Sequence, residues 1–190
     1  YEFDRGASVS RTRDQEVRWR TKALMTASMC GHTAQLQKLL QKGTNPNFHD
    51  ETGATALMMA SYKGQADTVE LLLDYGANPD QQDQNGWTAL MTASDYGHTN
   101  VVRLLLDKGA LLHIQDTDGN RALDHAARDP GKSRDDVHTH TDRDILAENS
   151  DISEHPNAGK QEMTDSYSHT LALLQNAEAD VAARRRARGA

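Results

Sequence analysis

The chain has little of what a thick globular core or a disulfide-bonded scaffold needs. Among its 190 residues are one cysteine, four prolines and two phenylalanines, and aromatic residues make up 5% of the total. Cys30 alone cannot form an internal disulfide, which fits a protein of a reducing, intracellular compartment. So few large apolar side chains suit one small domain or a short repeat array, in which each unit buries only the faces that touch its neighbours.

Other absences limit the function. No apolar run approaches the length of a membrane span, and no secretory signal pattern opens the chain. No glycine-rich loop has the spacing that cradles phosphates, so we expect no cofactor and no small-molecule substrate. The first residue is Tyr1 rather than Met. We therefore expect a cytoplasmic protein, with an organellar location after removal of a targeting segment as the alternative.

The charge is distributed unevenly along the chain. The net charge is −7, but residues 1–20 sum to +1, residues 21–128 to −4 and residues 129–180 to −8. Residues 181–190 sum to +4, from Arg184, Arg185, Arg186 and Arg188. A mildly acidic body with an arginine-rich tip is not typical of a dedicated nucleic-acid binder.

One short sequence motif recurs at a fixed spacing of 33 residues. Its leucines are Leu24, Leu57, Leu90 and Leu123, each preceded by alanine, and the glycines Gly43, Gly76 and Gly109 keep the same period. In the third unit, Asp83–Gly86 predicts a turn, and Thr88 is placed to cap a first helix. The stripe at 101–106 predicts a second helix that ends at Gly109. A repeat architecture follows from this period.

The Thr-Ala-Leu-Met phrase at this period resembles the ankyrin-repeat family, whose usual phrase is Thr-Pro-Leu-His. Here alanine replaces the proline, and Met25, Met58 and Met91 replace the histidine. The resemblance is strong over residues 19–128. It implies an all-α ankyrin-repeat solenoid of about four repeats, and a protein that binds other proteins rather than an enzyme.

The fourth unit departs from the period after its first helix. Pro130 stands where Gly97 stands one repeat earlier, and the expected apolar stripe appears only at 170–174, as if 36 residues were inserted. The rival interpretation takes Asp144–Ala147 as the second helix and the C-terminal stretch as a separate tail. The predicted organisation is an extended arm (1–18), repeats 1 to 3 with the first helix of repeat 4 (19–129), a polar, acidic and His-rich insertion (130–166), and a C-terminal helix with an Arg-rich tail (167–190).

The resemblance also implies a binding face, because turn tips and first helices line the concave side of such arrays. Tyr62, Trp87 and Tyr96 are the expected aromatic anchors on that face. We predict a scaffold or accessory subunit of a larger assembly, with the arm and the insertion also lying against the partner. The full set of predicted partner-binding residues is Glu51, Tyr62, Lys63, Gln84, Asn85, Trp87, Asp95, Tyr96, Asn120 and Arg128.

Three further possibilities rest on single features. His138 and His140 could hold a metal, but no cysteine accompanies them and their spacing matches no defined motif, so no metal is predicted. The Arg184–Arg188 cluster could bind nucleic acid, with a solvated helix end as the favoured reading. By resemblance to ankyrin substrates of an asparaginyl hydroxylase, Asn47 is a candidate for hydroxylation, and turn formation is the favoured role.

Overall fold

The structure, a computed structural model, describes residues 5–127 and 160–188. Most of the predicted insertion lies outside the described residues, as does the rival helix at 144–147. Within these ranges the secondary structure is helical, with no strand and a single isolated bridge between His49 and Thr55.

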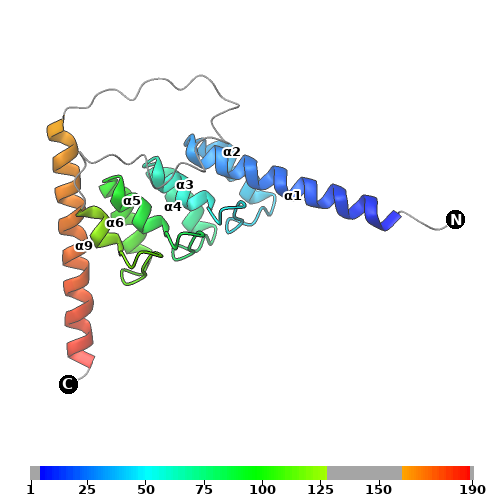
Figure 1. The fold of residues 1–190 in the computed structure, drawn as a ribbon. Helices are drawn as coiled ribbons and strands as arrows, with labels where there is room; N and C mark the ends of the chain where they lie inside the picture. The colour runs from blue at the N-terminus through cyan, green and yellow to red at the C-terminus, as the bar shows by residue number, and fades with distance from the viewer. Residues whose placement is uncertain (1–4, 128–159, 189–190) are drawn as a thin grey trace.

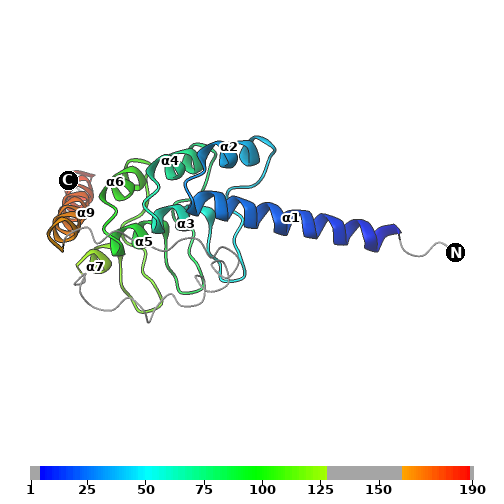
Figure 2. The ribbon, with the colours of Figure 1, turned by 90° about the horizontal axis from the view of Figure 1, so that it is seen from above.

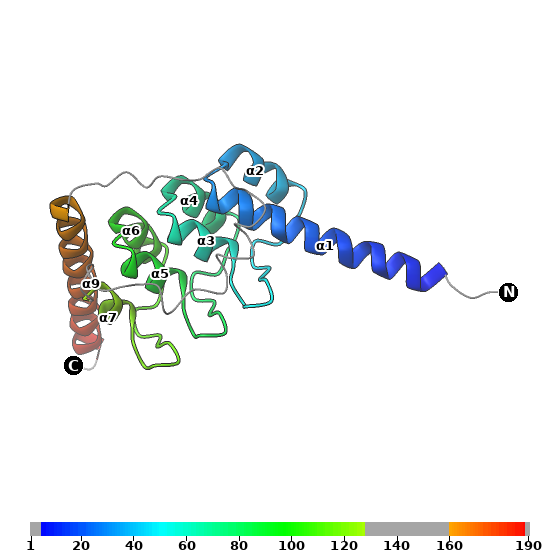
Figure 3. The ribbon, with the colours of Figure 1, turned by 45° about the horizontal axis from the view of Figure 1, so that its top comes forward.

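Two rows of helices make up the fold (Figures 1 and 2). In the inner row α1 packs on α3, α3 on α5 and α5 on α7; in the outer row α2 packs on α4, α4 on α6 and α6 on α9. Loops project from the inner row beside each pair of neighbours, as Figure 3 shows. The helices are α1 (Arg5–Met29), α2 (Thr33–Gln41), α3 (Ala56–Tyr62), α4 (Ala66–Asp74), α5 (Ala89–Asp95), α6 (Thr99–Asp107), α7 (Ala122–Ala126) and α9 (Lys160–Arg188).

The repeated leucines build the core between the rows. Leu24, Leu57 and Leu90 of the inner helices are at most 1% exposed. Leu72 and Leu105 hold equivalent places in the outer row and are fully buried. Each repeat therefore buries apolar side chains against both neighbours, which is how an array with so few aromatic residues becomes stable.

The helix starts follow from local side chains. The hydroxyl groups of Thr55 and Thr88 accept hydrogen bonds from the backbone N–H three residues later, which satisfies one free amide at each helix start. Arg121 stands at the equivalent position of repeat 4 and offers no such acceptor. There the Asp124 carboxylate accepts from the Arg121 N–H at 2.9 Å instead.

Successive loops stack because each turn aspartate and each turn glycine recurs with the period. In each loop one Oδ1 atom accepts backbone N–H groups two and four residues later; the aspartates are Asp50, Asp83 and Asp116. Gly86 has φ +77°, and a Cβ there would lie 2.9 Å from the Asp116 Cα of the next loop. Any larger residue at Gly86 would strain the turn and separate the loops.

α9 closes the array at the place of the missing second helix of repeat 4. It packs on both α6 and α7. His98 Nε2 lies 2.9 Å from the Tyr62 carbonyl, and the Tyr167 hydroxyl donates to the Asp95 carbonyl, one repeat further on, at 2.8 Å. Each ring also covers the glycine of the preceding repeat. Tyr167 thus plays the role of His98 one repeat later. The 69 residues between them in sequence correspond to the 33-residue period plus a 36-residue insertion.

The predicted fold class, an all-α repeat solenoid, is confirmed. α9 begins at Lys160, inside the stretch predicted as insertion. The predicted extended arm differs more: it is helical from Arg5 and continuous with the first helix of repeat 1. Residues 5–21 contain no proline and many good helix formers, so the helix continues where the apolar stripe was missing.

Candidate functional site

Four of the predicted binding residues lie on the loops. Glu51, Gln84 and Asn85 are exposed at the tips, and Asn120 is half-buried. Neighbouring loops are joined by hydrogen bonds at the period of the repeat. The Gln84 side-chain amide donates to the Glu51 carbonyl, and the Thr117 N–H donates to the Asn85 carbonyl at 2.9 Å. The loops therefore form one connected edge.

Four more lie at the C-terminal ends of α3 and α5. The rings of Tyr62 and Tyr96 meet edge to face, with centroids 4.6 Å apart and an interplanar angle of 81°. The Lys63 ammonium lies 4.5 Å from the centre of the Tyr62 ring. Asp95 is half-buried beside Tyr96 in sequence. Two neighbouring repeats thus join their aromatic side chains into one partly exposed cluster, and a cation already occupies a ring face.

The prediction that Trp87 is an exposed anchor is wrong. Trp87 is only 4% exposed, and its ring packs on the His125 ring with centroids 4.2 Å apart. The equivalent residue one repeat earlier, Ala54, is also buried. The small residue Ala54 at the position equivalent to Trp87 was the available signal that a side chain at this position points into the stack.

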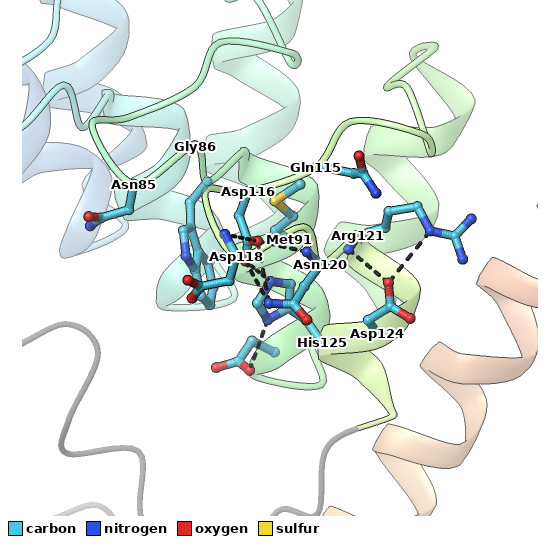
Figure 4. Close-up of polar contacts among 12 residues, drawn as sticks. Asn85, Gly86, Met91, Gln115, Asp116, Asp118, Asn120, Arg121, Asp124 and His125 are labelled. Carbon is cyan, nitrogen blue, oxygen red and sulfur yellow. Dashed lines mark hydrogen bonds and ion pairs between the residues drawn. The ribbon is translucent and has the colours of Figure 1, made fainter.

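A buried polar cluster around His125 was missed by sequence reasoning (Figure 4). His125 is 0% exposed, with Nε2 2.9 Å from Asp116 Oδ2 and Nδ1 3.7 Å from Asp95 Oδ1. The available signal was the position of His125 in the repeat. The same position holds Met59 and Thr92 in the two preceding inner helices, so a histidine there lies on a helix that packs in the stack. His125 links the third loop to the end of α5, and so connects the loop edge with the aromatic cluster.

The environment of Asp116 lowers its pKa. Burial alone would raise the pKa of the carboxyl group, but hydrogen bonds from the backbone and side chain of Asn120 and from His125 outweigh that effect. An aspartate–histidine pair can serve in catalysis, yet this imidazole has no surface open to solvent, so the pair supports a structural role. Within 5–127 and 160–188 no group of three or more His, Cys, Asp or Glu residues could hold a metal ion.

The comparison with known families agrees with this geometry. The profile described as ankyrin repeats (3 copies) matches residues 6–83, 24–117 and 75–138, which together cover more than half of the chain. The chain belongs to the ankyrin-repeat family. Ankyrin repeats are generally modules for protein–protein interaction and are typically not enzymes. No curated protein matches the chain. No helix in the described part is long and apolar enough to cross a membrane.

The net negative charge of the ankyrin body comes from its loops and inner helices. The segments 48–63, 79–96 and 114–127 hold eight acidic and two basic residues. The outer-row segments 33–47, 64–78 and 97–113 hold four of each. The inner side is therefore strongly acidic, while the outer side is balanced.

Some of the remaining candidate residues lie outside the described part of the chain and others inside it. Arg128, His138 and His140 lie outside the described residues, and Arg184–Arg186 are exposed near the end of α9. The Asn47 side chain bridges two repeats: Nδ2 donates to the Gly76 carbonyl at 3.0 Å, and Oδ1 accepts from the Asn78 N–H at 2.6 Å. These bonds support a turn-forming role, and hydroxylation of Asn47 stays a prediction.

The lowered pKa of Asp116 makes ankyrin stability depend on pH. A carboxyl group whose pKa is lower in the folded than in the unfolded chain stabilises the fold fully at pH values above its unfolded pKa, which is near 3.9. That stabilisation is lost as the pH falls through the folded pKa. In Asp116→Asn the charged hydrogen bonds are lost, at about 1.5–3 kcal/mol at neutral pH. Denaturant unfolding between pH 2 and pH 7 should show a flatter profile for this variant. Asp118→Asn, an exposed neighbour, should keep the wild-type profile; equal profiles for all three proteins would contradict the assignment.

Proposed function

We propose that the chain is a non-catalytic scaffold or accessory subunit that binds a protein partner within an intracellular assembly. The observation that carries this proposal is the Tyr62–Tyr96 pair, held edge to face across two repeats. We use the term inner surface for this pair, its neighbours at the ends of α3 and α5, and the predicted binding residues on the loops. The inner surface comprises Glu51, Tyr62, Lys63, Gln84, Asn85, Asp95, Tyr96 and Asn120.

Physical reasons make this surface suited to binding. Tyrosine offers a large amphipathic contact area with few rotatable bonds, so little side-chain entropy is lost on binding. The loops are fixed by their own hydrogen bonds to one another, so the partner does not have to order them. The polar amides of Gln84 and Asn85 supply hydrogen-bonding groups at the exposed loop tips.

The charge of the inner side favours a basic partner segment. Its acids outnumber its bases eight to two, and Lys63 shows that the Tyr62 ring accepts a cation. Arginine or lysine side chains of a partner would be attracted by the acidic residues and could pack on the tyrosine rings. Complementary charge speeds association and rejects acidic competitors, while the aromatic contacts hold the complex together.

The decisive variant is Tyr62→Ala combined with Tyr96→Ala. The partner is first captured by crosslinking to the tagged full chain in cells of the native source, identified by mass spectrometry and purified. Titration calorimetry should then show a dissociation constant raised at least about tenfold, because truncation of an aromatic hot spot costs 2 kcal/mol or more.

Tyr75→Ala is the matched control, since Tyr75 is an exposed tyrosine at the end of the outer helix α4. It should change the dissociation constant by less than about twofold. Unchanged affinity in the inner-surface variant, together with a loss in Tyr75→Ala, would move the binding site to the outer row and reject the proposal.

A further inference from the structure

The N-terminal half of α1 projects beyond the repeats (Figures 1 and 2). Among the α1 side chains that the structure describes, residues 15–19 are exposed and the buried ones lie between Leu24 and Met29. Trp19 is 64% exposed and Val17 37% exposed, and no other large apolar residue in the described chain is as exposed as Trp19. A tryptophan so placed on a regular helix offers a large contact area to another surface.

The charge of this helix is opposite to that of the inner side. α1 contains six basic and two acidic residues. Arg18 is exposed, and Arg20 pairs with Glu16 at 2.6 Å. Around Trp19 the basic residues therefore outnumber the acidic ones, although the chain as a whole is acidic.

Such a projection gains little stability by itself. Most helix stability in proteins comes from packing of one face and not from helix propensity. Residues 15–19 are all exposed, so the repeats supply no packing there. Contact with a further surface would supply the missing stabilisation.

We infer that the projecting part of α1 binds the inner surface of a second copy of this chain. The segments 48–63, 79–96 and 114–127 around the inner surface hold eight acids and two bases, and the surface itself carries the Tyr62–Tyr96 pair. α1 brings arginines on both sides of an exposed tryptophan, so charge and apolar contact match in the same pair of surfaces. Each copy carries both elements, and a reciprocal exchange closes into a two-fold dimer. The inference rests on the proposed binding role of the inner surface and names the segment it receives.

Sedimentation of the full chain tests this directly. At about 50 mM salt and about 100 μM protein, the wild-type chain should sediment as a dimer that dissociates as salt rises to about 500 mM. Arg18→Glu with Arg20→Glu should raise the dimer dissociation constant at least about tenfold. The same is expected separately for Glu51→Lys of the inner surface combined with Asp118→Lys, an exposed acid on the loop that also carries Asn120. Arg103→Glu, an exposed arginine of the outer helix α6, is the matched control and should leave the dimer intact.

Thermal unfolding of each variant by circular dichroism shows that the fold is retained. A monomeric wild-type chain at low salt overturns the inference, as does a dimer that either pair of substitutions leaves unchanged. The proposed function is tested independently by the partner titration, done with the Arg18→Glu, Arg20→Glu chain. If the chain is monomeric but its inner surface binds another protein, only the inference fails.

Discussion

Replacing Trp87 with alanine should lower the free energy of unfolding by about 3–5 kcal/mol, the cost of removing a large buried aromatic side chain. Its ring is 4% exposed and packs on His125, so truncation leaves a cavity beside the His125 ring of α7. Guanidinium unfolding followed by circular dichroism measures the change.

The other tryptophan provides the control. Trp19 is 64% exposed, and Trp19→Ala should change the free energy of unfolding by less than about 0.5 kcal/mol. The comparison is made at protein concentrations where the chain is monomeric. If Trp87→Ala were as stable as Trp19→Ala, Trp87 would not be the structural residue described above.

Leu174→Ala should destabilise the whole array by about 2–5 kcal/mol. Leu174 is 0% exposed where α9 meets the last repeats, and without that contact α6 and α7 lose an apolar neighbour. Because repeats stabilise one another through their interfaces, the loss should appear in the unfolding of the array and not only in α9.

Val181→Ala is its partner variant, since Val181 lies on the same helix and is 43% exposed. It should change stability by less than about 0.5 kcal/mol. Unfolding curves that coincide for Leu174→Ala and wild type would mean that α9 is an appended tail and does not complete the fourth repeat.

The repeat positions predicted much of the fold. The 33-residue spacing of Leu24, Leu57 and Leu90 located the inner helices, because a buried position recurs whenever identical units stack. The 50 residues from Leu123 to Leu173 located the last outer helix, since α9 packs where a helix one period after α6 is needed.

The contacts specific to single repeats were not predictable in the same way. The family resemblance places loop residues at the surface and so predicts an exposed Trp87, whereas His125 supplies a flat ring for the indole to pack on. The helical arm was missed because α1 continues without an apolar stripe, and periodicity detects only helices that pack. Tyr62 and Tyr96 occupy the inner row of neighbouring repeats, so the sequence could place them together, and their rings do meet. Their role in partner binding stays a prediction.

Amide hydrogen exchange of the chain with and without its purified partner tests the central claim most directly. We predict slower exchange on binding at the loops 50–54 and 83–87 and at the helix ends 62–63 and 95–96. The outer helices α2, α4 and α6 should exchange at unchanged rates and serve as the internal reference. Protection confined to these outer helices, with the loops and helix ends unaffected, would contradict binding through the inner surface.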